Sequence, residues 1–319
     1  MNKNFKKIVS KIKEYKYIVI ARHKSSDLDC LGSQFALKEW INLNFKDKKV
    51  YCIGENHGLY TSRKFIPTSD TIDFENEKYL CICVDFNQFY RIDGEEIFKN
   101  ADYKICIDHH KGEPDAFDYF YINNNYIACS QIIAEFMFSC KTKKMNELVC
   151  KYLFAGISSD SGNFFYEACN SQTFKVGAKL LEIGKFNQFY DFHLLVNMDT
   201  LEDARIRNKL FEKIVYDKEN RIAYYINSIS DLKEIGTTAH GANEKIGDFN
   251  RIEEFGIVLS ASEYEEGMYR CSIRSKEKSI VEVAEKYGGG GHKFAFGVKG
   301  INKDEIMALI DDLKKIKKN

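Results

Sequence analysis

The sequence has few of the features that mark membrane, zinc-ribbon or disulfide proteins. No stretch approaches the roughly 20 apolar residues that span a bilayer, which argues against a transmembrane helix. The ten cysteines are scattered and include no CxxC pair, which argues against a zinc or redox motif. Cysteines inside apolar runs, such as Cys81 and Cys83 in YLCICVD, are typical of small buried side chains in a reduced compartment. We therefore expect a cytoplasmic protein with no membrane partner.

An excess of charge of one sign is also lacking. Lys plus Arg and Asp plus Glu number 47 each, so the formal net charge is zero. Proteins that hold long nucleic acid through its phosphates need a basic field, which this composition does not supply. We therefore expect no long nucleic acid as a partner, and any nucleic-acid substrate should be short. The ATP-binding pattern GxxxxGK[ST] does not occur either.

Short apolar strands alternate with helical patterns in the first part of the chain. Continuous apolar runs predict buried parallel strands at 17–21, 50–54, 79–84 and 103–107. Apolar residues at a spacing of 3.6 predict helices at 33–43, 130–139, 146–157 and 171–183. This alternation is typical of an α/β fold in which helices flank a mostly parallel sheet.

A chain of 319 residues can bury two separate cores, so we expect two domains. The first should span residues 1–190. Residues 191–220 should form a helical linker, because NMDTLEDARIRNKLFEKIVYDKENR is charged and has little strand character. Residues 221–319 should form a smaller α/β lobe, with strands in RIAYYINS, FGIVLSASEY and MYRCSIRS. Helices should follow at 279–287 and near 303–317.

Acidic residues and histidines follow the predicted strands or helices at four places in the first domain. They are His23, Asp27 and Asp29 in HKSSDLD, Asp85 in YLCICVD, Asp108, His109 and His110 in YKICIDHH, and Asp160 in LFAGISSDSG. In open α/β sheets, ligands bind beyond the carboxyl ends of the strands, so these four segments should converge on one site.

Each of these residues has an ordinary structural interpretation when it is taken alone. An aspartate after a strand is commonly a helix cap or a turn residue, and Asp29 with Gly32 could start the following helix. The DHH triplet could form a hydrogen-bonded turn whose histidines face water. The occurrence of all four segments at one inferred sheet edge favours a functional site over these separate interpretations.

Carboxylates gathered in this way repel one another unless a cation neutralises them, so the pattern predicts a metal site. Oxygen ligands alone would suit Mg²⁺ or Ca²⁺, whereas histidine nitrogen moves the preference toward Mn²⁺, Co²⁺ or Zn²⁺. Five or six ligands suit two ions that share a carboxylate. Such a pair activates a water for attack on phosphorus. The predicted reaction is hydrolysis of a phosphate ester or anhydride.

A second cluster lies in the smaller lobe, where Arg270, Arg274, Ser275 and Lys276 precede a run of four glycines and His292. Glycines let backbone N–H groups approach an anion closely, and the basic side chains add charge-assisted hydrogen bonds. The alternative is a flexible glycine loop between a helix and a strand. The adjacent histidine and basic strand favour phosphate binding.

With these motifs in this order, the sequence resembles the DHH phosphoesterase superfamily, in particular its two-domain members with a C-terminal DHH-associated domain. The resemblance is carried by HKSSDLDCLGS, VDFNQFYR, DHH and SSDSGNFFY, and by RSK followed by GGGGHKFAFG. It implies two manganese ions, for which Co²⁺ or Mg²⁺ could substitute.

The resemblance also implies a role for each residue of the two clusters. One ion would be held by His23, Asp27 and Asp85, and the other by Asp29, Asp85, His109 and Asp160, with Asp85 as the bridge. Asp108 would orient its neighbours, and His110 would contact the scissile phosphate or assist the leaving oxygen. The far end of the substrate would be held by Arg274, Ser275, Gly288, Gly289, Gly290, Gly291 and His292. The active site would lie in the cleft between the lobes.

Among the subfamilies, the chain looks most like the compact bifunctional enzymes that cut very short RNA (nanoRNA) into mononucleotides and convert 3′-phosphoadenosine 5′-phosphate (pAp) to AMP. The alternative is a cytosolic phosphodiesterase for cyclic di-AMP or the linear dinucleotide pApA, which shares every motif. Two further alternatives are a catalytically silent nucleotide-binding module and an inorganic pyrophosphatase or polyphosphatase. A homodimer is expected from the resemblance alone.

Overall fold

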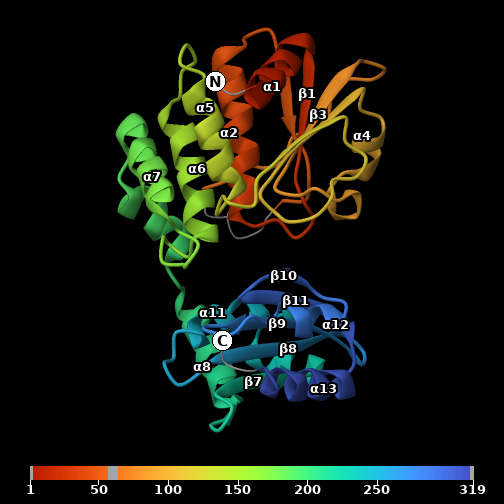
Figure 1. Cartoon of the computed structure of the whole chain (residues 1–319), viewed down its shortest axis with the longest axis vertical. Helices are drawn as coiled ribbons and strands as arrows, with labels where there is room; N and C mark the ends of the chain where they lie inside the picture. The colour runs from red at the N-terminus through yellow and green to blue at the C-terminus, as the bar shows by residue number, and fades with distance from the viewer. Residues whose placement is uncertain (1–2, 57–63, 317–319) are drawn as a thin grey trace. The chain divides into compact units, whose positions relative to one another are not determined.

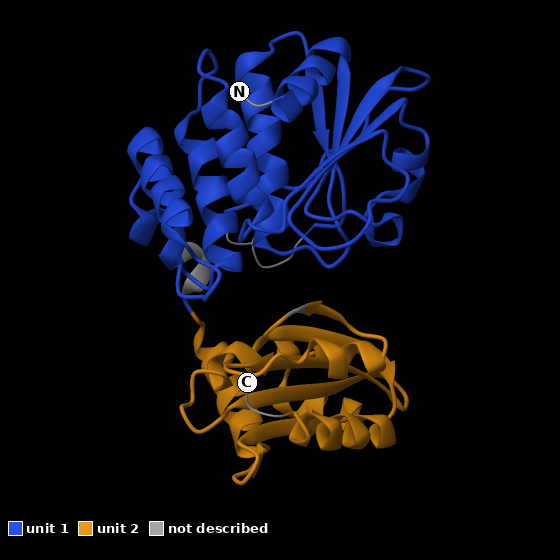
Figure 2. Ribbon diagram, in the orientation of Figure 1, with its two compact units in different colours: residues 1–198 blue, residues 199–319 orange. Residues whose placement is uncertain are grey.

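A five-stranded, all-parallel sheet forms the centre of the first of two compact units, which comprise residues Met1–Met198 and Asp199–Asn319 (Figure 2). The computed structural model describes residues 3–56 and 64–316, except for the side chains of residues 195–197 and of His292. No helix in this described part is long and apolar enough to cross a membrane.

The strand order of the first sheet is β2-β1-β3-β4-β5. Its strands are β1 Tyr17–Ala21, β2 Lys49–Cys52, β3 Tyr79–Val84, β4 Tyr103–Asp108 and β5 Tyr119–Ile122. Because β1 lies between β2 and β3, the chain leaves β1 toward one edge of the sheet and later returns to its other side. Ligands of doubly wound sheets bind at such a switch point, beyond the carboxyl ends of the two strands.

Helices cover the sheet, and alternate residues of each strand enter different cores. Ile18 and Ile20 of β1 pack with α1, α2, α5 and α6, whereas Val19 and Ala21 pack with the core that contains Phe98 of α4 (Figure 1). The helical segments of this unit are α1 Lys3–Glu14, α2 Leu28–Asn44, η1 Phe89–Arg91, α4 Glu95–Lys99, α5 Cys129–Ser139, α6 Glu147–Asp160, α7 Ser171–Gly184 and η2 Phe189–Asn197.

The second unit is built on a six-stranded mixed sheet of order β10-β11-β9-β8-β7-β6. Among the described strands of this sheet, β7 and β8 pair in parallel and the other neighbours pair antiparallel. Helices α12 and α13 pack on one face, and α8 to α11 form the core with the other face. Its strands are β6 Val215–Asp217, β7 Ile222–Asn227, β8 Ile257–Glu265, β9 Met268–Ser275, β10 Gly290–His292 and β11 Ala295–Ile301. Its helices are α8 Leu201–Glu212, α9 Ile229–Ile235, α10 Ala239–Glu244, α11 Ile246–Phe249, α12 Val281–Lys286 and α13 Lys303–Lys314.

The predicted α/β class is confirmed, with differences in detail. The predicted strands 17–21 and 79–84 have the observed bounds. Residues 191–220, expected as a helical linker, contain part of η2, the helix α8 and also the short strand β6, which pairs antiparallel with β7. Part of the glycine run is a strand rather than a loop, because Gly290 and Gly291 pair with Gly297 and Phe296.

Helices α2 and α6 approach each other through glycines beneath the predicted site. A Cβ at Gly32 would overlap the carbonyl oxygen of Tyr152. A Cβ at Gly156 would overlap the hydroxyl of Ser130 and would lie 2.9 Å from Oδ1 of Asp29. The close approach therefore places α6 directly against the α2 residue Asp29.

We expect Gly156→Ala to destabilise the protein by about 1–3 kcal/mol, because the added methyl group must displace Ser130 and Asp29 in a packed interior. Scanning calorimetry measures this change. Gly247→Ala is the control, since a Cβ there meets no atom within 4 Å and alanine favours the helix α11. An equal effect of the two substitutions would contradict this packing.

Candidate metal centre

The centre is built around Asp85, which directly follows β3. The residue is 1% exposed, and its φ of 67° lies in the left-handed region that few residues other than glycine adopt. Its backbone N–H donates to the carbonyl of Ile107 on β4 at 2.9 Å. The strained backbone turns the carboxylate so that its two oxygens face two different groups of side chains.

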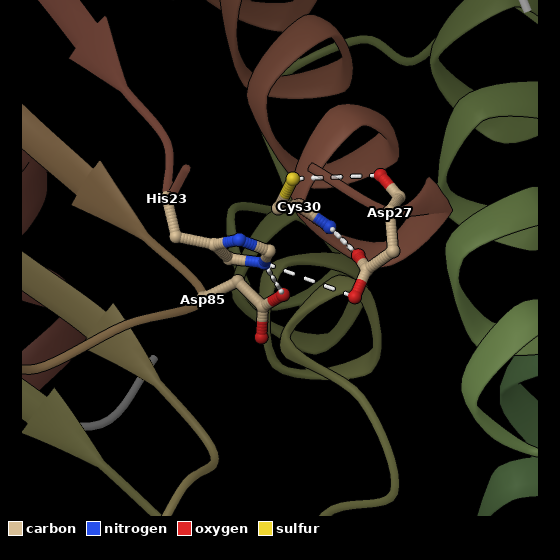
Figure 3. Close-up of side chains that lie close together, drawn as sticks. All are labelled: His23, Asp27, Cys30 and Asp85. Carbon is tan, nitrogen blue, oxygen red and sulfur yellow. Dashed lines mark hydrogen bonds and ion pairs between the residues drawn. The ribbon is translucent and has the colours of Figure 1, made fainter. Parts of the chain in front are cut away.

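The first group contains His23, Asp27 and Asp85 (Figure 3). Nε2 of His23 lies 3.3 Å from Oδ2 of Asp85 and 3.8 Å from Oδ2 of Asp27. The other ring nitrogen, Nδ1, lies 2.8 Å from the carbonyl of Lys24. If Nδ1 carries the proton that this carbonyl accepts, Nε2 is the nitrogen that can bind a cation.

Asp27 has two roles in this group. Its Oδ1 accepts the N–H of Cys30 at 3.0 Å and so caps the N-terminus of α2, while Oδ2 points toward His23. Cys30 also belongs to the group, although the sequence did not single it out (Figure 3). Burial raises the pKa of Cys30 to about 12, so its sulfur stays a protonated thiol. Its spacing, three residues after Asp27 in the first turn of a helix, is the signal that could have revealed it.

The second group lies around His109. Nε2 of His109 is 3.3 Å from Oδ1 of Asp85, 3.5 Å from Oδ2 of Asp160 and 3.8 Å from Oδ2 of Asp29. Nδ1 lies 3.3 Å from the carbonyl of Tyr126. Asp160 is the last residue of α6, whereas the sequence placed it just past this helix. The structure thus brings all six predicted ligands together, and Asp85 alone belongs to both groups.

Asp29 is fixed by a contact that the sequence did not reveal. Its Oδ2 accepts the N–H of Cys129 at 2.6 Å, and its Oδ1 accepts the N–H of Ser130 at 2.8 Å. These two residues begin α5, whose N-cap residue Ala128 has no side chain that could cap the helix. Asp29 therefore caps α5 from α2, and the positive end of the helix dipole faces its carboxylate.

Asp108 holds the two histidines that follow it. Its Oδ1 lies 2.7 Å from the backbone nitrogen of His109, 3.2 Å from that of His110 and 2.8 Å from Nδ1 of His110. Asp108 is fully buried and His110 is partly exposed. Asp108 thus fixes both the backbone of the turn and the ring of His110.

The charges of the centre shift its pKa values in opposite directions. Burial raises the pKa of Asp29 to about 7, and the charge of Asp85 adds to this rise. Burial and the charge of Asp29 hold the pKa of Asp160 well above its usual range. Burial alone would lower the pKa of His109, but the hydrogen bond and charge of Asp85 raise it to about 10. Burial alone would raise the pKa of Asp85, but hydrogen bonds from His109 and His23 hold it well below its usual range.

The donor set fits divalent cations. Three overlapping groups of His, Asp and Cys side chains in the described part of the chain place one ligand atom each within 4.8 Å of one another. Oδ1 of Asp85 is buried, and its 3.3 Å contact with Nε2 of His109 is longer than an ordinary hydrogen bond, so the described residues do not fully use its capacity to accept. Imidazole nitrogen with carboxylate oxygen is a donor set for Mn²⁺, Co²⁺ or Zn²⁺, and cations here would replace the protons on the imidazoles.

The predicted substrate-binding residues lie in the second unit. The backbone of His292 pairs with that of Ala295, which pairs with that of Arg274, so these residues form one row across β10, β11 and β9. The side chain of His292 lies outside the described part of the structure. Ser275 is buried, and its hydroxyl accepts the N–H of Lys278 at 3.1 Å.

The four glycines of the run differ in whether the fold requires glycine at their positions. Gly288 adopts a left-handed φ of 70° after α12. A Cβ at Gly289 or Gly291 would overlap the backbone of β11. A Cβ at Gly290 meets no atom within 4 Å, and its backbone is not left-handed. The fold itself therefore does not require glycine at position 290.

We expect cations to stabilise the protein more strongly as the pH rises. Ligation needs Asp29 ionised and His109 neutral, and their pKa values of about 7 and about 10 mean that both carry protons below pH 7. For each ligand that must lose a proton, the affinity for the cation falls about tenfold for each unit by which the pH drops below the pKa of that ligand. The rise in Tm caused by Mg²⁺, Mn²⁺ or Co²⁺ should therefore be larger at pH 8 than at pH 6, as measured by scanning fluorimetry.

The metal-free protein should show the opposite trend. Both folded pKa values are raised, so the stability that these groups contribute is present at low pH. It is lost as the pH rises through about 7 for Asp29 and about 10 for His109. Samples in EDTA provide this control. A cation-induced rise in Tm that is equal at both pH values, or larger at pH 6, would contradict the arrangement.

Comparisons with known proteins show the family of this chain. Residues 17–157 match the DHH family, N-terminal domain, and residues 222–319 match the DHHA1 domain. A Streptococcus mutans protein named probable bifunctional oligoribonuclease and PAP phosphatase NrnA is 33% identical over 318 residues, which cover 98% of this chain and 99% of that one. A Mycoplasma genitalium protein named bifunctional oligoribonuclease and PAP phosphatase NrnA is 30% identical, over 97% of this chain and 96% of its own.

Among solved structures, an exopolyphosphatase-related protein from Bacteroides fragilis superposes with a TM-score of 0.81 at 18% identity. The superposition covers 99% of this chain and 98% of that one, and at this identity it shows the fold alone. The two domain matches and the near full-length identity to the Streptococcus mutans protein show the family: this chain belongs to the DHH family and carries a C-terminal DHHA1 domain.

Proposed function

We propose that this DHH-family hydrolase acts as a manganese-dependent phosphoesterase that cuts short oligoribonucleotides into mononucleotides and converts pAp to AMP. The observation that carries the proposal is the position of Asp85, whose two oxygens lie 3.3 Å from His23 and His109 in two separate ligand groups. One carboxylate shared between two groups of ligands suits a pair of cations. The two relatives named as oligoribonuclease and PAP phosphatase support the substrate class.

In this proposal, His23, Asp27 and Asp85 hold one Mn²⁺, and Asp29, Asp85, His109 and Asp160 hold the other. The ions would supply an activated water and neutralise the charge of the phosphoryl oxygens. Nδ1 of His110 donates to Asp108 at 2.8 Å, which directs Nε2 of the same ring away from Asp108. When both ring nitrogens are protonated, His110 can then donate a hydrogen bond from Nε2 to the scissile phosphate or a proton to the leaving oxygen.

The second unit would bind the remainder of the substrate. We propose this role for Arg274, Ser275, Gly288, Gly289, Gly290, Gly291 and His292. The row of Arg274, Ala295 and His292 supports it, because two residues that can carry positive charge share this row. The formal net charge of zero favours short substrates. A cytoplasmic location, a homodimer and a substrate between the two units stay predictions from the sequence.

Rates with Mn²⁺ on four nucleotide substrates and pyrophosphate test the function. We expect pAp and a 5′-phosphorylated RNA dinucleotide to be hydrolysed fastest, with an RNA pentamer slower. Faster hydrolysis of cyclic di-AMP would favour the dinucleotide phosphodiesterase, and faster hydrolysis of pyrophosphate would favour the pyrophosphatase. Nucleotide binding without any turnover would indicate a silent module.

In the same assay, Asp85→Asn should lower the rate at least about a hundredfold, because it removes the charge that both ligand groups share. Asparagine keeps the shape of the side chain and tolerates the left-handed backbone, so the fold should be retained. Asp102→Asn is the control. Asp102 accepts the N–H of Tyr79 at 3.0 Å, at the other end of β3. Undiminished turnover in Asp85→Asn would refute the proposed role of Asp85.

Gly290→Ala tests the role of the glycine run. Because a methyl group there meets no protein atom, the Tm should stay unchanged, as in the control Gly247→Ala. If backbone groups at Gly290 approach a substrate phosphate, the KM for pAp should rise about tenfold, through the loss of a charge-assisted contact. A KM equal to that of the wild type would show that substrate does not approach this glycine.

A further inference from the structure

A hollow of about 680 Å³ lies in the first unit and is lined by residues from α6, α7, η2 and the segment between α6 and α7. Six of its thirteen lining residues are phenylalanines: Phe154, Phe164, Phe165, Phe174, Phe189 and Phe192. Ser158, Asn163, Gln188 and His193 add polar groups, and none of the lining residues is Lys, Arg, Asp or Glu. The hollow has the size of a site for a nucleoside or another small molecule.

A chain segment that lines the hollow also carries Asp160, one of the proposed ligands of the metal centre. Ser158 and Asn163, which both line the hollow, flank Asp160 in the chain. The hydroxyl of Ser158 donates to Oδ1 of Asn163 at 2.7 Å, and the N–H of Asn163 donates to the carbonyl of Ser158 at 2.7 Å. These bonds close a tight turn around Asp160, whose Oδ2 is 3.5 Å from His109. The hollow and the metal centre therefore share this short segment of the chain.

The turn after Asp160 is strained and presents an exposed ring. Gly162, Asn163 and Phe164 have φ values of 56°, 57° and 67°, so two residues other than glycine adopt the left-handed conformation in succession. Phe164 packs on Phe154, with ring centres 5.6 Å apart. The next residue, Phe165, is 89% exposed. Strain of this kind concentrates at functional sites, and Phe165, five residues after Asp160 in the chain, is one of the residues that line the hollow.

We propose that this hollow binds the nucleobase of the nucleotide whose phosphate is hydrolysed, by stacking it on phenylalanine rings. The inference rests on the proposed function and adds a site for the base in the first unit. An uncharged planar ring matches a wall without formal charges, and the polar side chains at the rim can pair with the edge of the base. Stacking accepts every base, which suits an enzyme that degrades RNA of any sequence.

The test compares the binding of AMP and of ribose 5-phosphate, which lacks the base, by calorimetry with Mn²⁺. Both are product-like ligands, so the measurement does not need turnover. The wild-type protein should bind AMP at least about tenfold more tightly than ribose 5-phosphate. Phe165→Ala, which removes an exposed ring, should reduce this ratio several-fold and leave the affinity for ribose 5-phosphate unchanged.

Ala178→Phe is the second variant, because Ala178 is an exposed residue of α7 that lines the hollow and a larger side chain would fill it. It should also abolish the preference for AMP. Lys175→Phe is the matched control. It places the same ring on an exposed position of the same helix, outside the lining of the hollow, and should leave the ratio unchanged.

Three results would overturn the proposal. The first is equal binding of AMP and ribose 5-phosphate by the wild-type protein. The second is an equal loss of both affinities in Phe165→Ala and Ala178→Phe. The third is a change in oligomeric state in Phe165→Ala, seen by sedimentation velocity with an unchanged ratio, which would make this surface a contact between two copies of the chain. If any of these three results is found while the wild-type protein hydrolyses pAp and short RNA as proposed, the proposed function stands and only the proposed site for the base is refuted.

Discussion

The buried charge of Asp85 is the constraint on which the rest of the centre depends. Its carboxylate stays ionised in the interior because His23 and His109 lie 3.3 Å from its two oxygens. The raised pKa values of Asp29 and Asp160 show that further negative charge beside Asp85 is unfavourable, and the raised pKa of His109 shows that the site attracts positive charge. Divalent cations would neutralise the carboxylates of the centre more completely than protons on the histidines do.

The residues around Asp85 have conformations and contacts that are unfavourable by themselves but that position its carboxylate and the neighbouring ligands. Asp85 has a left-handed backbone conformation. Position 156 is glycine, and the absence of a side chain there lets α6 approach Asp29. Asp29 is used twice, as a neighbour of His109 and as the cap of α5, so a change at this position would weaken a helix as well as the centre. Stability and the ligand geometry are thus coupled through the same side chains.

The sequence was sufficient to predict four strands of the first sheet and the convergence of their ends, but not the fifth strand, β5. Continuous apolar runs define β1 and β3, and parallel strands necessarily end at one edge, so His23 and Asp85 had to be neighbours. The sequence could not reveal that Asp29 caps α5, because this contact joins residues 100 positions apart. It could not reveal the left-handed backbone of Asp85 either, since that conformation is imposed by the packing around β3 and β4. The strand at Gly290 was missed because glycine favours loops over strands.

The claim that Asp85 bridges two cations can be tested directly by anomalous diffraction from crystals grown with Mn²⁺. Our account predicts two manganese peaks per chain, one beside His23 and Asp27 and one beside His109, Asp29 and Asp160, each in contact with a different oxygen of Asp85. A single peak, or two peaks of which one does not contact Asp85, would contradict it.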